Sequence, residues 1–243
     1  MVNSVLPALL EGLFPHQCLF CGLPSRGALP LCAGCKGDLQ ANKLCCSRCA
    51  LPLPGSPARS AAPLCGQCLR QAPAFDRVIA PWLYDEMFAY LIHRWKYQGE
   101  QRLTALLAQL WLCHDLPLGN IDLMVPVPLH WRRRWWRGFN QSQLLCRALR
   151  DACPELAMLP ILDRAISRKR ATAAQSGMNA RQRARNLKGA FTVHKPCDNL
   201  RVAVVDDVLT TGATAAALAR ELRSAGASHI EIWCLARTPA PTN

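Results

Sequence analysis

The sequence predicts an α/β protein whose largely parallel sheet is preceded by a small cysteine-rich module. Four Cys-x-x-Cys pairs are confined to residues 18–68, and after Pro73 short apolar runs alternate with amphipathic stretches. One apolar run near residue 205 leads through two acids and a turn of small residues into a helical pattern. The cysteine pairs set the module apart, and the other two observations indicate βα units.

The balance of residues is that of a globular protein. The chain has 243 residues, of which 51% are hydrophobic and 19% charged, so it can hold one ordinary domain and a small module. No run of about 18 uncharged apolar residues occurs, which predicts no transmembrane segment. The first residues carry no Lys or Arg ahead of their apolar stretch, unlike a secretory signal. We therefore expect a cytoplasmic protein.

The spacing of the cysteines predicts bound metal. Two residues between paired cysteines let one tight turn direct both sulfurs at the same tetrahedral ion, at about 2.3 Å from each. Both resulting sites are filled by cysteine alone, so we expect two structural zinc ions and no open position for catalysis. The predicted ligands are Cys18, Cys21, Cys32, Cys35, Cys46, Cys49, Cys65 and Cys68.

The pairing of these cysteines stays open at this point. Pairs one and two can close one site and pairs three and four the other, or a cross-braced arrangement can join one with three and two with four. Redox-active motifs are the alternative, but they seldom come four in a row without a strand–helix pattern around them. Cys45 and His16 are spare ligands that we interpret as loop residues.

We assign the cysteine-rich module to residues 1–73 and the α/β domain to residues 74–243. Residues 51–63 are rich in turn formers and too poor in large apolar residues to build a core without metal, and residues 5–14 have the spacing of a short amphipathic helix. The predicted strands of the α/β domain are Arg77–Pro81, Leu123–Pro126, Val202–Val205 and Ile230–Cys234. Its predicted helices are Glu86–Tyr97, Leu103–Cys113, Gln141–Ala152 and Ala213–Ala225.

The most informative segment is residues 202–214. A short apolar strand delivers two acids at its carboxyl end, where open α/β sheets bind ligands, and a turn of small residues then opens a helix. The N–H groups of that turn, the helix dipole and the threonine hydroxyls can hold a phosphate, while the acids can accept hydrogen bonds from ribose hydroxyls. The predicted ligand residues are Asp206, Asp207, Thr210, Thr211, Gly212, Ala213 and Thr214.

This segment resembles the 5-phosphoribosyl-1-pyrophosphate (PRPP) loop of type I phosphoribosyltransferases, in which two acids and two variable residues precede Thr-Thr-Gly-x-Thr or a close variant. The resemblance implies that PRPP binds here, with Mg²⁺ neutralising its pyrophosphate. The sequence departs from the members that salvage hypoxanthine and guanine, which carry an acid where this chain has Thr210. That departure disfavours a nucleobase-salvage enzyme.

Three further stretches resemble the ComF family, the competence-protein relatives that include the GntX proteins: Val125-Pro-Val-Pro, Arg137-Gly-Phe-Asn-Gln and Lys96-Tyr-Gln-Gly. That family joins a cysteine-ligated zinc ribbon to a phosphoribosyltransferase-like domain, which implies a double zinc ribbon here. The resemblance implies a pyrophosphate pocket beside Arg137, Gly138 and Asn140. It also implies a flexible loop over residues 168–191 with Gln175, Arg181 and Arg185 as its polar positions.

The excess of positive charge indicates an anionic partner. The chain has 29 Lys and Arg and 16 Asp and Glu, which gives a net charge of +13. Residues 123–150 contain six Arg and no acid. There Arg132, Arg133 and Arg134 precede Trp135, and cations beside a stacking ring suit single-stranded nucleic acid. The alternative is a solvated basic surface with its tryptophans in the core.

The leading hypothesis for function is a ComF-type protein that binds PRPP or a phosphoribosyl compound and serves DNA uptake or the use of imported DNA, a role that the resemblance implies. No residue is identified as a general base, so the catalytic residues stay unassigned. One competing hypothesis is a non-catalytic phosphoribosyl sensor that binds single-stranded DNA or DNA-uptake proteins. Another is a nucleobase-salvage phosphoribosyltransferase.

Overall fold

The computed structural model describes residues 16–25, 29–55, 62–114, 116, 118, 120–168, 187 and 189–240. The helix expected within residues 5–14 lies outside this part of the chain. The chain divides into two compact units, Met1–Gln40 and Ala41–Asn243. The first unit carries the first two cysteine pairs, and the second carries the other two pairs together with the whole sheet. Independent folding of residues 1–73 stays a prediction.

A small ribbon and a short helix hold the cysteines of the first unit. Strand β1 (His16–Gln17) pairs antiparallel with β2 (Pro24–Ser25). Helix α2 (Ala33–Asp38) begins after Cys32, whose sulfur accepts a hydrogen bond from the Cys35 N–H at 3.4 Å. The cysteine therefore acts as the helix cap, and this fixes the turn between the two sulfurs.

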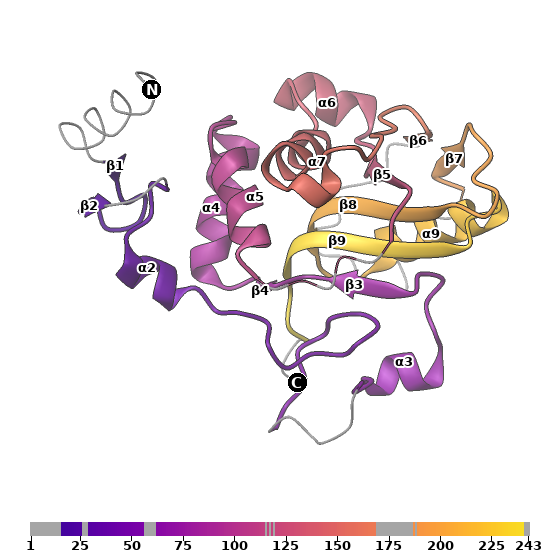
Figure 1. Cartoon of the computed structure of the whole chain (residues 1–243), viewed down its shortest axis with the longest axis horizontal. Coiled ribbons are helices and arrows are strands. Elements are labelled where there is room, and N and C mark those ends of the chain that lie inside the picture. Colours follow the sequence, from indigo (N-terminus) through magenta and orange to yellow (C-terminus); the bar gives the residue numbers. More distant parts are fainter. Residues whose placement is uncertain are drawn as a thin grey trace. The chain divides into compact units, whose positions relative to one another are not determined.

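A parallel sheet of five strands forms the centre of the second unit (Figure 1). Its hydrogen-bonded order is β3-β9-β8-β5, and β4 also pairs with β9. The predicted strands are all present, and the two central strands are longer than predicted. The bounds are β3 (Arg77–Ile79), β4 (Trp82–Leu83), β5 (Leu123–Pro126), β8 (Arg201–Leu209) and β9 (His229–Arg237).

Helices cover both faces of this sheet, as parallel strands buried on two sides require. Val204 of β8 lies in one hydrophobic cluster with Leu218 of α9. On the opposite face, the centroid of the Trp111 ring of α5 lies 5.3 Å from the centroid of the Trp233 ring of β9. The four predicted helices are confirmed as α4 (Glu86–Tyr97), α5 (Leu103–Leu112), α7 (Gln141–Ala152) and α9 (Ala213–Ser224).

Short elements that the apolar periodicity did not predict complete the unit. They are too short, or too polar, to show a repeat of hydrophobic positions. Strands β6 and β7 form an antiparallel hairpin that bounds the stretch expected to be a flexible loop. These elements are α3 (Gly66–Arg70), α6 (Trp131–Arg137), the 3₁₀ helix η1 (Pro154–Leu156), β6 (Ile166–Arg168) and β7 (Phe191–Val193).

The second cysteine ribbon shares the hydrophobic core of the sheet. Ala50, only 2% exposed, belongs to the same cluster as Phe75 and Leu209. The Asn42 side-chain amide donates to the carbonyl of Ala50 at 2.9 Å and to that of Ala80 at 3.1 Å. These contacts tie the ribbon to the segment that follows β3, so ribbon and sheet should unfold together.

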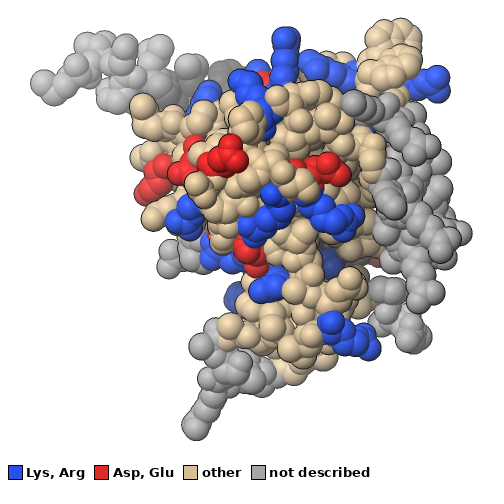
Figure 2. Space-filling view, turned by 90° about the vertical axis from the view of Figure 1, so that its right-hand side faces the viewer, with Lys and Arg blue, Asp and Glu red and all other residues tan. Residues whose placement is uncertain are grey.

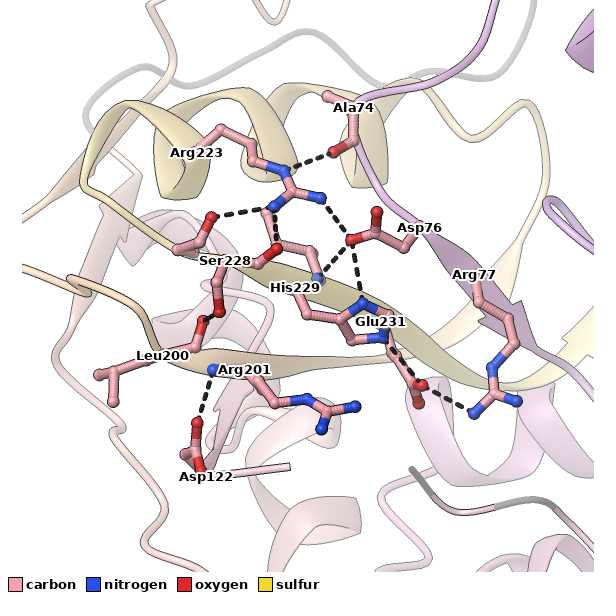
Figure 3. A network of polar contacts seen from close by, with 12 residues as sticks. Ala74, Asp76, Arg77, Asp122, Leu200, Arg201, Arg223, Ser228, His229 and Glu231 are labelled. Carbon is pink, nitrogen blue, oxygen red and sulfur yellow. Dashed lines mark hydrogen bonds and ion pairs between the residues drawn. The ribbon is translucent and has the colours of Figure 1, made fainter. Parts of the chain in front are cut away.

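A polar network at the amino ends of β3 and β9 holds this edge of the sheet (Figure 3). The Asp76 carboxylate accepts the Ile230 N–H at 2.7 Å and pairs with Arg223 from the end of α9. Glu231, 1% exposed, pairs with Arg77 at 2.7 Å. These contacts lie at the amino ends of the strands and leave the carboxyl ends for a ligand site.

Replacing one cysteine in each ribbon should distinguish the two units. Cys32 and Cys65 are matched, since each caps a short helix through its sulfur and serine keeps a capping oxygen. Cys65→Ser should reduce bound zinc from about two ions to about one and lower the main melting temperature, because the second ribbon shares the core. Cys32→Ser should lower zinc equally and leave that transition unchanged. Zinc assay and calorimetry provide both readouts.

An equal fall of the main melting temperature in both variants would contradict this division of the chain. An unchanged main transition in Cys65→Ser would instead support a module that ends near residue 73.

Candidate functional site

Eight cysteines of the described residues meet in two clusters, and within each cluster all sulfurs lie within 4.8 Å of one another. The first two pairs form one cluster and the last two form the other, so the structure excludes the cross-braced arrangement. The first cluster is Cys18, Cys21, Cys32 and Cys35, and the second is Cys46, Cys49, Cys65 and Cys68.

The spacing of the sulfurs fits tetrahedral zinc. Four Zn–S bonds of about 2.3 Å place the sulfurs about 3.8 Å apart along the edges of the tetrahedron. The Cys21 and Cys32 sulfurs are 3.7 Å apart, and those of Cys49 and Cys65 are 3.6 Å apart. Each cluster supplies four ligands, which leaves no position for water or substrate, and zinc in these sites is structural.

Backbone N–H groups prepare one thiol in each cluster for a cation. Although burial raises its pKa, N–H donors, chiefly that of Cys32, lower the pKa of Cys18 to about 6. Donors led by the Cys65 N–H lower the pKa of Cys46 to about 7 against the same effect of burial. Since the thiolate is the form that binds metal, each cluster already offers a charged ligand near neutral pH.

A cavity of about 250 Å³ opens at the carboxyl end of β8. We call it the loop cavity. Residues 206–214 form one wall, so all the ligand residues predicted on that segment line it. Side chains from distant parts of the chain form the other polar walls: Tyr84, Lys96, Tyr97, Arg137, Gln141, Ser142 and Arg168.

The wall formed by β8 and α9 combines acids with an anion-binding turn. Asp206 and Asp207 lie within β8, because its pairing with β9 continues as far as Leu209. Gly212, at φ +73°, adopts the left-handed conformation that glycine tolerates best and caps α9. The first N–H groups of α9 have no acceptor within the helix, so this end can bind a phosphate.

The two acids have different surroundings. Asp207 forms an ion pair with Lys96 of α4. The Asp206 carboxylate accepts the Asp207 N–H at 2.9 Å and the Ser142 hydroxyl at 3.5 Å. Burial raises the pKa of Asp206 to about 6, although Lys96, Ser142 and Arg168 act in the opposite direction. Asp206 is therefore mostly charged only above about pH 6.

Three cations reach the loop cavity from three separate elements, α4, α6 and β6. The Arg137 guanidinium lies 4.9 Å from the centre of the Tyr97 ring, and that of Arg168 lies 5.5 Å from the Phe191 ring. Sequence reasoning did not place Lys96 or Arg168 in the site, although both occur in motifs that resemble the ComF family. With acids on one wall and cations on the others, the cavity can bind a ligand that carries both hydroxyls and phosphates.

The remaining predicted site residues have other positions. The described residues that line the loop cavity include Arg137 but neither Gly138 nor Asn140. Gly138, at φ +78°, ends α6, and the Asn140 side chain caps α7 by accepting the Ser142 N–H at 3.0 Å. The predicted loop residues Gln175, Arg181 and Arg185 lie outside the described residues.

A buried arginine connects the second zinc cluster to the anion-binding turn. Arg237, 6% exposed, donates from Nε to the Cys49 carbonyl at 3.2 Å. Its Nη1 donates to the carbonyls of Leu209, at 3.0 Å, and Thr210. Because a guanidinium is a rigid fork of donors, this side chain fixes the position of the turn relative to the ribbon.

Helix α6 presents aromatic and basic side chains on the surface. Trp131, Trp135 and Trp136 are 65%, 85% and 68% exposed, so the alternative that placed these tryptophans in the core is wrong. The Arg132 guanidinium lies 5.2 Å from the Trp131 ring, while the side chain of Arg133 lies outside the described part of the structure. On the face shown in Figure 2, Lys and Arg side chains stand along the upper edge, the level at which Figure 1 shows α6, and also across the middle of the face.

Comparisons with known proteins match both parts of the chain. Residues 9–72 match the double zinc ribbon domain. DNA utilization protein YhgH of Escherichia coli O157:H7 is 36% identical over 92% of this chain and 98% of its own length. Competence protein F of Haemophilus influenzae is 33% identical over 94% of this chain and 100% of its own.

Among solved structures, purine phosphoribosyltransferase from Pyrococcus horikoshii matches 61% of this chain and 75% of its own, with 19% identity and a TM-score of 0.30. No helix of the described residues combines the length and the apolar character needed to cross a membrane.

Asp206→Asn should stabilise the protein in a pH-dependent way. The pKa of Asp206 is raised from its ordinary 3.8 to about 6, so ionising this carboxyl in the folded state costs stability as the pH rises from about 4 past 6. The variant avoids that cost, and its melting temperature should exceed that of the parent at pH 8 and equal it below about pH 4. The exposed Asp151→Asn is the control and should change neither value. A constant difference at all pH values would contradict the assignment.

Arg237→Lys should loosen the anion-binding turn. Lysine cannot reach all the carbonyls that the guanidinium contacts, and removing a hydrogen bond from a charged donor costs about 1.5–3 kcal/mol. We expect lower stability in urea together with weaker binding of inorganic phosphate. Arg223→Lys is the matched control, because Arg223 also donates to backbone carbonyls but at the opposite end of the sheet. It should lose stability and keep phosphate binding. Equal phosphate affinity in the two variants would remove the link to the turn.

Proposed function

We propose a function for this chain from the premise that it belongs to the ComF family with DNA utilization protein YhgH and competence protein F. The chain binds PRPP or a related phosphoribosyl compound in the loop cavity. It serves DNA uptake or the use of imported DNA. The names of these relatives support the DNA role, and the loop cavity supports the ligand. The two parts of the proposal can be tested separately.

One arrangement carries the ligand assignment: two carboxylates and a threonine-rich helix cap lie in the same cavity. The N–H groups of residues 210–214 and the positive end of α9 would bind the 5-phosphate. Asp206 and Asp207 would accept hydrogen bonds from the two vicinal ribose hydroxyls, and charge-assisted bonds of this kind are the strong ones. Such a ligand uses both the acidic and the phosphate-binding wall.

The cations of the cavity suit the pyrophosphate group. Arg137 and Arg168 offer planar forks that match phosphate oxygens. Lys96 pairs with Asp207 in this structure, and a ligand that hydrogen-bonds Asp207 would free Lys96 to contact the pyrophosphate. Mg²⁺ bound together with PRPP would neutralise the remaining charge.

Transfer of the phosphoribosyl group is compatible with this arrangement. As the bond at the anomeric carbon breaks, negative charge builds on the departing pyrophosphate, and the fixed cations Arg137 and Arg168 would stabilise it. No lining residue is assigned as a general base, and the acceptor is not identified. The enzyme class is therefore decided by measuring turnover.

Exposure of the tryptophans of α6 favours a second candidate, contact with single-stranded DNA. Stacking of bases on exposed rings and phosphate contacts to neighbouring arginines do not require catalysis. The protein would then act as a phosphoribosyl sensor that binds DNA or DNA-uptake proteins. Nucleobase salvage is the third candidate, and Thr210 disfavours it because the hypoxanthine and guanine enzymes carry an acid at that position.

The double variant Asp206→Asn with Asp207→Asn should lose PRPP binding and remain folded. Two charge-assisted hydrogen bonds contribute about 1.5–3 kcal/mol each, so the affinity should fall by about 100-fold or more. Calorimetric titration with PRPP and Mg²⁺ at pH 8 measures it, and Asp151→Asn is the control. Unchanged affinity would remove the main support for the ligand assignment.

The same titration separates enzyme from sensor. Pyrophosphate released on adding a candidate acceptor would assign a transferase, whereas binding without release would support the sensor. In either case PRPP binding should weaken as the pH falls through about 6, where Asp206 takes up a proton.

Single-stranded DNA should bind with an affinity that falls steeply with salt, because binding to phosphates releases counterions. Changing Arg132, Arg133 and Arg134 together to Ala should flatten the slope of log affinity against log salt by about 0.7 for each phosphate that the variant no longer neutralises. Trp135→Ala should cost about 1–3 kcal/mol at every salt concentration if the ring stacks on a base. Met158→Ala, which alters another exposed apolar side chain, is the control. Absence of binding at low salt would contradict the DNA interaction.

A further inference from the structure

A second cavity, of about 430 Å³, lies next to the loop cavity and shares Leu129 and Arg168 with it. Its lining comes from residues 128–129, from α6 and Asn140, from the turn at residues 163–164, from β6 and from His194 after β7. We call it the arginine cavity. Its volume is within the range of about 300–1,000 Å³ that small-molecule sites occupy. A ligand in it would lie beside a ligand of the loop cavity.

The arginine cavity is built to receive an anion. Three arginines line it, Arg134, Arg164 and Arg168, from three different segments. The acid in the lining, Asp163, already accepts hydrogen bonds from Gln143 at 2.5 Å and from Arg147 at 3.2 Å. The lining of this cavity thus carries three guanidinium groups and one carboxylate, and a doubly charged phosphate would reduce the repulsion between the arginines. Clustered arginines are also the side chains that bind phosphate with the best geometry.

The same cavity offers hydrogen-bonding and aromatic groups beside the cations. Trp131, 65% exposed, forms part of the wall. The centroid of the His130 ring lies 5.5 Å from that of the Trp131 ring, so the indole packs against a neighbouring ring. The His194 Nε2 is 2.7 Å from the Ser167 hydroxyl, and both residues line the cavity. A flat ring placed against Trp131 would stack, and its polar edge would find partners.

We infer that the arginine cavity binds a nucleoside monophosphate unit, with its phosphate held by Arg134, Arg164 and Arg168 and its base stacked on Trp131. The unit is either a free mononucleotide or the phosphorylated end of a DNA strand. This inference goes beyond the proposed function, because it places a second anionic ligand outside the loop cavity. Arg168, which lines both cavities, would contact both ligands. The two cavities together would place a nucleotide next to a phosphoribosyl compound.

The test uses the full-length, zinc-loaded protein and titration calorimetry with thymidine 5′-monophosphate. Three probes serve for comparison. Thymidine lacks the phosphate, inorganic phosphate lacks the nucleoside, and O-phosphoserine carries its phosphate on an amino acid. The monophosphate should bind at least about 10-fold more tightly than each of them, because one phosphate–arginine contact and one stacked base each contribute a factor of that order. Oligothymidylate with and without a 5′-phosphate separates the two sources: a preference for the phosphorylated strand over the free nucleotide assigns the strand end.

Arg164→Ala is the informative variant, because this arginine lies neither in the loop cavity nor on α6. It should weaken thymidine monophosphate binding about 10-fold or more and leave PRPP binding unchanged. Arg150→Ala, which removes a surface arginine of α7, is the matched control and should change neither. Trp131→Phe should retain more affinity than Trp131→Ala. The double variant at Asp206 and Asp207 should lose PRPP and keep the nucleotide, which separates this inference from the proposed function.

Four results would overturn the inference. Thymidine binding as tight as that of its monophosphate would remove the phosphate interaction. Inorganic phosphate or phosphoserine binding equally well would leave a plain anion site without a nucleotide. Wild-type nucleotide affinity in Arg164→Ala, with the fold intact by circular dichroism, would place the ligand elsewhere. Loss of nucleotide binding in the Asp206 and Asp207 double variant would assign it to the loop cavity.

Discussion

Along β8 and β9 eight residue pairs are in parallel register, from Arg201 opposite His229 to Leu209 opposite Arg237, and the ligand site and the second ribbon take their positions from this ladder. Strands covered by helices on both faces must satisfy their backbone groups by pairing with each other, which makes the register costly to change. The ladder continues past the apolar residues and carries Asp206 into partly buried surroundings, where desolvation raises its pKa to about 6. At its end it brings Arg237 beside the turn. A carboxylate whose charge is costly to bury is thus held by strands whose register is costly to change.

The two zinc ribbons have the same chemistry and different relations to the rest of the protein. Each places four cysteine sulfurs around a position for one ion, and each uses a cysteine sulfur as a helix cap. The second also contributes Ala50 to the core of the sheet, and its Cys49 carbonyl accepts a hydrogen bond from Arg237. Zinc in the second ribbon therefore stabilises a segment that contacts the anion-binding turn. Zinc in the first ribbon stabilises a unit whose described residues, 16–25 and 29–40, include few large buried side chains, and there metal takes the place of a hydrophobic core.

In both cavities basic side chains outnumber acidic ones. In the loop cavity Lys96, Arg137 and Arg168 stand opposite Asp206 and Asp207, which suits a ligand with both hydroxyls and phosphates. In the arginine cavity the acid of the lining, Asp163, is paired with Arg147. Arg168 belongs to both linings. Two anionic ligands in neighbouring cavities would thus share one cation, which would lower their mutual repulsion.

The sequence by itself determined the parts that depend on local patterns. The Cys-x-x-Cys spacing predicts the zinc ligands because two sulfurs on one turn reach one ion, and the run from Val202 to Thr214 predicts a strand, two acids and a helix cap because each follows from neighbouring residues. Only the tertiary structure decided which cysteine pairs combine, since both arrangements use the same turns. It also brought Lys96 and Arg168 to the acids across more than 30 residues of sequence, exposed the tryptophans of α6, and joined the second ribbon to the turn through Arg237. These features depend on the packing of elements that are distant in the chain, which local periodicity does not encode.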